Sequence, residues 1–355
     1  MRSSRSFVLF SFTLFFSLFS IVALLLQNTS TNLLSLVLSS HFLFRVVLVG
    51  VGMTLFLLLR EKKTFLNSSL FFFILLMVAY FLSFLSLFFV RDGNPRFYSE
   101  VISPGLLLTS TSILYLSEVI DADNITLEDV LLFSFIISSI ALILFLLTDF
   151  AFMMISFLTL IFLAFSLKFS FGIKTLLLSI ALIVLSIVLF MMSSSFVKTF
   201  TEGLSLNKPF MTFYKKTEAS LSQSLSPFVF YEYATGEMIF SLLYRFKVYG
   251  ALIITALLFA LVVLLFSASS VSAKTGDGKS AVRNYVIAVF FSLLVLFPLL
   301  SLSTSLPFFK CDLPFVTPSN TSVFVEILLL SYVNASIKNV KVSSQNINEP
   351  LREEA

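Results

Sequence analysis

Cysteine, histidine and tryptophan are almost absent from the sequence, which has one Cys, one His and no Trp in 355 residues. Because Cys311 is alone, no intrachain disulfide can form, and neither Cys311 nor His41 belongs to a Cys/His cluster that could bind zinc. Charged residues are also scarce, at 12%, whereas 58% of the residues are hydrophobic and the mean hydropathy is +1.04. This composition excludes a soluble globular domain and predicts an integral membrane protein.

Long apolar runs, separated by charged or Pro/Gly/Asn-rich breaks, predict an all-α polytopic membrane protein with about ten transmembrane helices. The first run is too long for the core of a signal peptide, so we interpret it as a retained span. The fifth and sixth runs are separated only by Thr148 and Asp149, which predicts two helices joined by a tight turn. The expected spans are 7–26, 42–59, 66–90, 102–119, 130–147, 150–167, 172–192, 238–266, 284–304 and 321–337.

The distribution of Lys and Arg predicts that both termini face the cytoplasm, because the inner segments then carry more basic residues than the outer ones. The longest segment without a span, 193–236, is then a long extracytoplasmic loop between helices 7 and 8. It mixes lysines with Phe and Tyr, which fits either a segment lying on lipid headgroups or the lining of a substrate site. We expect one transmembrane domain over 1–340 and a cytoplasmic tail over 341–355.

Two short stretches carry signals for helix ends. Residues 126–129, TLED, resemble a capping box with Thr126 as the N-cap and Asp129 at the third helical position. A carboxylate between two spans, as at Asp149, is costly unless it faces water or a partner. Asp149 is therefore either a helix cap or a functional group.

Three other polar features are interpreted without a functional role. Arg45, in the second span, is expected to extend to the membrane interface. The GKS within 275–281 lacks the first glycine of a phosphate-binding loop, since Ala273 is at that position, and is interpreted as a solvated cytoplasmic turn. The glycosylation sequons, which include Asn320 and Asn334, arise readily by chance in a chain rich in Ser and Thr.

Residues 306–322, LPFFKCDLPFVTPSNTS, gather prolines and polar residues between the last two apolar runs. The two Leu–Pro steps disfavour helix and predict an extended turn on the outer face. The segment resembles the C-terminal signature of the SEDS family (RodA, FtsW and SpoVE), which reads approximately LPxTGxPLPFxSYGGSS. The matching positions, without a gap, are Leu306, Pro307, Leu313, Pro314, Phe315 and Ser322.

Four further segments resemble SEDS elements in the same order along the chain. GNPRFY (93–98) is similar to GxxRW, and PGLLLTSTSILYLS (104–117) to PSELAKLALILYLA. The stretch 147–165 resembles the QPDLG element and keeps Asp149, whereas 236–263 resembles the element that begins TDFIF after the long outer loop. The family's catalytic aspartate falls on Glu237 if DFIFA is laid on EMIFS, or on Gly236 without a gap.

The chain also departs from the family at polar positions. The Glu and Lys of PSELAK are replaced by Leu106 and Thr109, and the SYGG of the signature by residues 317–320. The remaining departures are Thr148 and Ala151 in the QPDLG element and Leu294 and Pro298 in the ninth span.

The resemblance implies a multi-pass protein of the bacterial cytoplasmic (inner) membrane that polymerises lipid II on the outer face, with a class B penicillin-binding protein as partner and no nucleic acid. It implies Glu237 as the general base, and side-chain cations or a divalent metal, Mg or Mn, to stabilise the departing diphosphate. We assign no metal ligands. The candidate substrate-binding residues are Asp149, Arg96, Lys198, Lys208, Lys215, Lys216, Lys310 and Ser322, and the structural motif is Pro104, Pro307, Pro314 and Phe315.

Two other functions stay open from the sequence. The lost polar residues favour a degenerate SEDS homologue that acts as a scaffold for a transpeptidase or for other division proteins. A transporter or flippase of lipid-linked precursors would call for paired charges inside the membrane, and Arg245 with Lys247 offers only positive ones.

Overall fold

A computed structural model of the chain describes residues 2–27, 40–59, 69–89, 103–120, 125–147, 149–167, 238–274, 277–301, 311–317 and 319–346. These residues form nine helices and no named strand. The expected seventh span, 172–192, and the long loop, 193–236, lie outside the described residues. The helices are α1 (Arg2–Gln27), α3 (Ser40–Leu59), α4 (Ser69–Phe89), α6 (Pro104–Val119), α7 (Leu127–Leu146), α8 (Phe150–Ser166), α13 (Met238–Lys274), α14 (Gly278–Ser301) and α15 (Asn320–Asn346).

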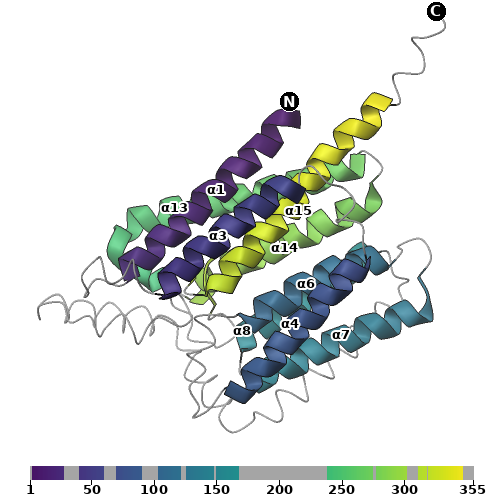
Figure 1. Cartoon of the computed structure of the whole chain (residues 1–355), viewed down its shortest axis with the longest axis horizontal. Coiled ribbons are helices and arrows are strands. Elements are labelled where there is room, and N and C mark those ends of the chain that lie inside the picture. The colour runs from purple at the N-terminus through teal and green to yellow at the C-terminus, as the bar shows by residue number, and fades with distance from the viewer. Residues whose placement is uncertain are drawn as a thin grey trace, which may run out of the picture.

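The helices form two groups that are joined along α14 and α15. One group contains α1, α3, α13, α14 and α15, and the other contains α4, α6, α7 and α8 (Figure 1). Within the first group α13 packs against α14 and α15 against α3, while α14 also packs against α8 and α6 of the second group. The start of α1 and the end of α15 lie at the same end of the bundle (Figure 1), where Ser6 Oγ donates to Asn334 Oδ1 at 2.7 Å.

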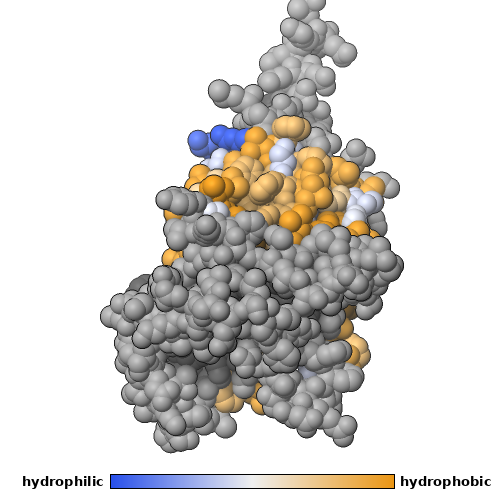
Figure 2. Space-filling model, turned by 90° about the vertical axis from the view of Figure 1, so that its left-hand side faces the viewer, coloured by the Kyte–Doolittle hydropathy of each residue, from blue (hydrophilic) through white to orange (hydrophobic). Residues whose placement is uncertain are grey.

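The outer surface of the bundle is apolar. Six of the described helices are long and apolar enough to cross a membrane, and α3 and α8 contain shorter apolar segments. Large hydrophobic side chains such as Phe81, Phe135 and Val263 are exposed on it. Hydrophobic residues also dominate the described part of the face in Figure 2. Because such a surface is stable in lipid and costly in water, the chain is a membrane protein.

The expected helix ends are confirmed at two places. Thr126 and Asp129 form a capping box at the start of α7. α7 ends at Leu146 and α8 begins at Phe150, so the fifth and sixth spans are separate helices joined by a tight turn.

Two helix ends differ from the expectation. The GKS stretch is not a turn between helices, because α14 begins at Gly278 and Asp277 Oδ1 caps it by accepting the N–H of Ser280 at 3.1 Å. At the other end of the chain, α15 continues to Asn346, so the first residues of the expected tail are helical.

Helices α6 and α8 approach each other closely near their N-termini. A Cβ atom on Gly105 would lie 2.3 Å from Cβ of Phe152, so this contact requires a glycine. One turn further on, the hydroxyls of Thr109 and Ser156 are hydrogen-bonded at 2.5 Å. The contact places the turn before α8 beside the start of α6, at the end of the bundle that holds the site described next.

Candidate functional site

The described part of the signature segment lies where the ends of several helices meet. The backbone N–H of Ser103, just before α6, donates to Thr321 Oγ1 of α15 at 3.2 Å. Arg45 of α3 donates to Asn320 Oδ1 at 2.7 Å and to the backbone oxygen of Ser20 in α1 at 3.4 Å. We call Arg45, Asp312, Thr317, Asn320 and Glu326 the Arg45–Glu326 cluster.

A tight turn at Leu313–Val316 is the centre of this site. The N–H of Val316 donates to the carbonyl of Leu313 at 3.0 Å. Pro314 at the second position and a positive φ of 63° at Phe315 are the pattern of a type II turn. Among the described residues, Phe315 is the only non-glycine with a positive φ. For a bulky residue this conformation costs about 1–3 kcal/mol, so the surroundings must hold it.

Two contacts hold Phe315 in this conformation. Its backbone N–H donates to Glu326 Oε2 of α15 at 2.7 Å. Its ring is buried and stacks on Phe16 of α1, with ring centroids 5.4 Å apart and an interplanar angle of 17°. A side chain from each of two helices therefore stabilises the strained residue.

Glu326 in α15 and Arg45 in α3 are both buried, with exposed fractions of 2% and 1%. Arg45 interacts electrostatically with Glu326 and, more weakly, with Asp312. The expectation that Arg45 extends to the interface is therefore wrong. Its guanidinium stays inside because acceptors and negative charge are available there, and a buried charge is tolerated only with such partners.

Thr317 and Ser319, from the stretch that stands where the SEDS signature has SYGG, cap the start of α15. Thr317 Oγ1 donates to Asp312 Oδ2 at 3.1 Å and accepts the N–H of Ser319, also at 3.1 Å. Ser319 Oγ in turn accepts the N–H of Ser322 at 3.3 Å, as an N-cap residue does. The sequon residues Asn320 and Asn334, to which the sequence gives no role, both accept buried hydrogen bonds.

Asp149 caps α8 at the edge of the site. Its Oδ1 accepts the N–H of Phe152 at 3.2 Å, which establishes the capping role. Burial raises the pKa of this carboxyl from 3.8 to about 6, although the Phe152 N–H favours the charged form. Its charge also acts on the Cys311 thiol, whose pKa burial raises, with smaller contributions from Asp312 and Asp149. The proposed role of Asp149 in substrate binding stays a prediction.

Five of the predicted site residues belong to the part of the chain that the structure describes, and all five lie in or beside this site. Pro104 is the first residue of α6, beside the Ser103–Thr321 contact, and Pro314 and Phe315 form the turn. Asp149 and Ser322 occupy the helix starts described above. The other predicted residues lie outside the described residues: Arg96, Lys198, Lys208, Lys215, Lys216, Glu237, Pro307 and Lys310.

Glu326 is not among the residues predicted from the sequence. The signal was present, because a single carboxylate within a long apolar run is costly and therefore marks a buried partner or a functional site. Two positions that are charged in the SEDS pattern, Leu106 and Thr109, are buried and neutral. Thr109 is engaged by Ser156 and by the carbonyl of Gly105.

The described residues contain no group of three or more His, Cys, Asp or Glu that could hold a metal ion. Asp149, Asp312 and Glu326 each accept a hydrogen bond from a protein group instead. The described part of the site therefore does not fit a divalent metal.

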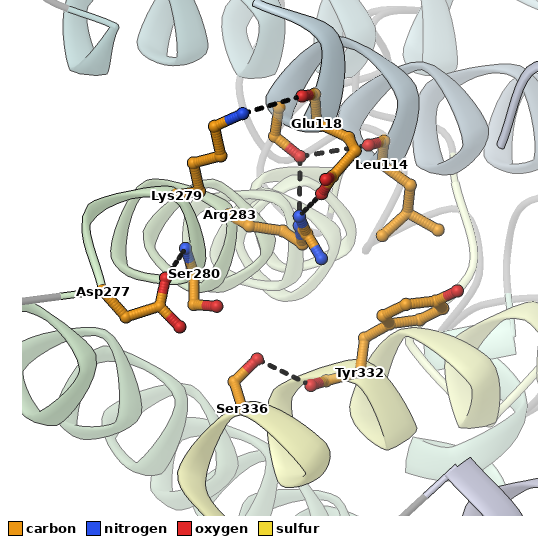
Figure 3. A network of polar contacts seen from close by, with 9 residues as sticks. Leu114, Glu118, Asp277, Lys279, Ser280, Arg283, Tyr332 and Ser336 are labelled. Atoms are coloured by element: carbon orange, nitrogen blue, oxygen red, sulfur yellow. Dashed lines mark hydrogen bonds and ion pairs between the residues drawn. The ribbon is translucent and has the colours of Figure 1, made fainter. Parts of the chain in front are cut away.

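A second polar cluster joins the end of α6 to the start of α14 (Figure 3), so it lies at the opposite end of α6 from the Leu313–Val316 turn. Arg283 forms an ion pair with Glu118 and donates from Nε to Ser117 Oγ at 3.2 Å. Its guanidinium also lies over the Phe72 ring, 5.7 Å from the centroid, and Lys279 Nζ donates to the Glu118 backbone oxygen at 3.3 Å. We call Ser117, Glu118, Lys279 and Arg283 the Arg283–Glu118 cluster.

No protein-family model and no curated protein matches the chain. Among solved structures, it is similar to a chain from work on the structural coordination of polymerization and crosslinking by a peptidoglycan synthase complex. The identity is 12% and the TM-score 0.49, and the match covers 92% of this chain and 97% of that chain.

Proposed function

We propose that the chain is a divergent SEDS-like protein of the bacterial cytoplasmic membrane that polymerises lipid II on the outer face with a class B penicillin-binding protein. The Leu313–Val316 turn is the observation that supports this proposal most strongly. It contains the LPF shared with the family signature, and it keeps a positive φ at Phe315 with the help of a buried carboxylate. Backbone strain of this kind clusters at functional sites.

The proposed topology has ten spans, with both termini in the cytoplasm and one transmembrane domain over 1–340. It puts the turn, the start of α6 and the start of α8 on the outer face. The loop 193–236, with its lysines, and Lys310, directly before Cys311, are then on the same side as the lipid II headgroup. These lysines and Arg96 are proposed to bind the diphosphate.

The proposed reaction needs one base. Glu237, which immediately precedes α13 in the sequence, is proposed to take the proton from the acceptor sugar hydroxyl as the diphosphate leaves. The lysines stabilise the negative charge that develops on the leaving diphosphate.

The test is elongation of lipid II by the purified chain in complex with its transpeptidase. Glu237→Gln is expected to abolish the activity and Glu237→Asp to retain part of it, because only the aspartate can accept the proton. Glu118→Gln, at the opposite end of the bundle, is the matched control and is expected to elongate lipid II normally. Full activity of Glu237→Gln would remove Glu237 from this role.

A second candidate is a scaffold that binds the transpeptidase without catalysis. The buried and neutral Leu106 and Thr109 favour it, because a site for a sugar diphosphate is expected to keep the charged groups that the SEDS pattern has at these positions. Under this function Glu237→Gln supports normal growth of a strain that depends on the protein. Loss of growth with unchanged binding of the transpeptidase would exclude the scaffold and support the polymerase.

A further inference from the structure

The Leu313–Val316 turn cannot satisfy all of its own backbone groups. Pro314 has no N–H, and the N–H of Val316 is used by the carbonyl of Leu313. The N–H of Phe315 therefore needs an acceptor from outside the turn, because Phe315 is completely buried and water does not reach it. Glu326 Oε2 is that acceptor, at 2.7 Å.

The acceptor also interacts with a positive charge from another helix. Arg45 of α3 interacts electrostatically with Glu326 of α15 and donates to Asn320, six residues before it in the same helix. A neutral acceptor would satisfy the Phe315 N–H as well, whereas a negative charge at residue 326 is tolerated in this buried environment only beside a positive partner such as Arg45. The turn, the carboxylate and the guanidinium thus form one connected unit.

We propose that Glu326 is a positioning residue for the reaction at the outer face, and that Arg45 is required only while residue 326 carries a negative charge. Glu326 fixes the turn through the Phe315 N–H, and Arg45 offsets the negative charge of the Glu326 carboxylate. This inference rests on the proposed function, in which groups beside the turn contact the lipid-linked sugar diphosphate.

When the conformation of the turn is fixed, the residues before and after it are fixed in position as well. Asp312, just before the turn, accepts the hydroxyl of Thr317, just after it, so the turn and the start of α15 are held together. Misplacement of reacting groups by about 1 Å can lower a rate about a hundredfold. We therefore expect release of the turn to lower kcat for lipid II polymerisation much more than it raises KM.

Two double variants separate positioning from a general structural role. Both replace the buried charges by neutral groups of similar size, which is often harmless to stability. Arg45→Met/Glu326→Gln keeps an acceptor for the Phe315 N–H, whereas Arg45→Met/Glu326→Met removes it. If the two residues have only a general structural role, both variants should show the same Cys311 labelling and the same kcat. If Glu326 positions the turn, only the Met/Met variant should lose the turn.

Cys311 reports on the turn without any assay of activity. It is the only cysteine of the chain, is 4% exposed and lies two residues before Leu313. In the full-length protein in detergent, maleimide is expected to label Cys311 at least about tenfold faster in the Met/Met variant than in wild type, because loss of the turn opens this region locally. The Met/Gln variant and Glu118→Gln are expected to label like wild type.

Kinetics on lipid II complete the test. The kcat of the Met/Met variant is expected to fall about 10- to 100-fold, and that of the Met/Gln variant to stay within about threefold of wild type. Equal labelling of the two double variants would overturn the inference. If wild type and both variants polymerise no lipid II while the labelling difference is present, the proposed function fails and the assignment of the residues that hold the turn stands.

Discussion

The two polar clusters at opposite ends of the bundle use the same chemistry for different purposes. In the Arg283–Glu118 cluster the ion pair and the Ser117 contact join side chains of α6 and α14. In the Arg45–Glu326 cluster the carboxylate binds a backbone N–H and the guanidinium binds the start of α15. The first cluster holds two helices together, whereas the second determines the shape of a loop.

Their environments differ as well. The side chain of Glu118 is 13% exposed, whereas the whole Glu326 residue is 2% exposed. Strained backbone is found at the second cluster only, within the part of the chain that the structure describes. An ion pair near a helix end is an ordinary way to stabilise a bundle, but a buried carboxylate that holds a strained turn indicates a requirement on the position of that turn.

The largest effect is expected from Glu326→Ala. This change leaves Arg45 buried without its main counter-charge and the Phe315 N–H without an acceptor, so we expect a loss of about 3–5 kcal/mol of stability. Thermal unfolding of the purified protein in detergent, followed by circular dichroism, measures it. Arg45→Met/Glu326→Ala is the control, because it removes the unpaired charge and should recover a large part of the loss.

A smaller effect is expected from Glu118→Gln. The glutamine can still accept a hydrogen bond from Arg283, so only the charge is lost, and we expect about 1 kcal/mol in the same unfolding measurement. Cys311 labelling should not change, because this cluster does not touch the turn. If Glu118→Gln loses as much stability as Glu326→Ala, the Glu118 charge is as important for the fold as Glu326, and the contrast between the two clusters is wrong.

The effect expected from Asp149→Asn is the smallest of the three near pH 4, and its size increases with pH. The pKa of Asp149 is raised in the folded protein from 3.8 to about 6, so the folded state binds this proton more tightly than the unfolded state. Stability therefore decreases as pH rises from about 4 to 6 and then stays level. Asparagine has no such dependence and still caps the helix. Asp149→Asn should thus match wild type near pH 4 and be more stable at pH 7.5.

A pH series of unfolding temperatures for wild type and Asp149→Asn checks this result. A constant difference over the whole range would show that burial of the Asp149 charge is not its cause. If Asp149→Asn also leaves lipid II polymerisation unchanged, Asp149 has no role in substrate binding and only caps α8.

The sequence predicted the helices well, because membrane helices are long apolar runs and their ends carry local signals such as the Thr126 capping box. It predicted a turn at Pro314, but not that Phe315 would adopt a positive φ, since that conformation depends on Glu326 and Phe16. The position of Arg45 was mispredicted for the same reason. Its partners lie in other helices, and hydropathy along one segment contains no information about pairing between distant segments.

The contact between Arg45 and Asn320 has a consequence for how the protein is made. The two residues are 275 positions apart, so at about 5–20 residues per second Asn320 is synthesised roughly 14–55 s after Arg45. During this time Arg45, which is buried in the finished protein, has not yet met its acceptor Asn320. We therefore expect the packing around Arg45 to be completed only after α15 has been made, and a chain truncated before Asn320 to leave Arg45 without this acceptor.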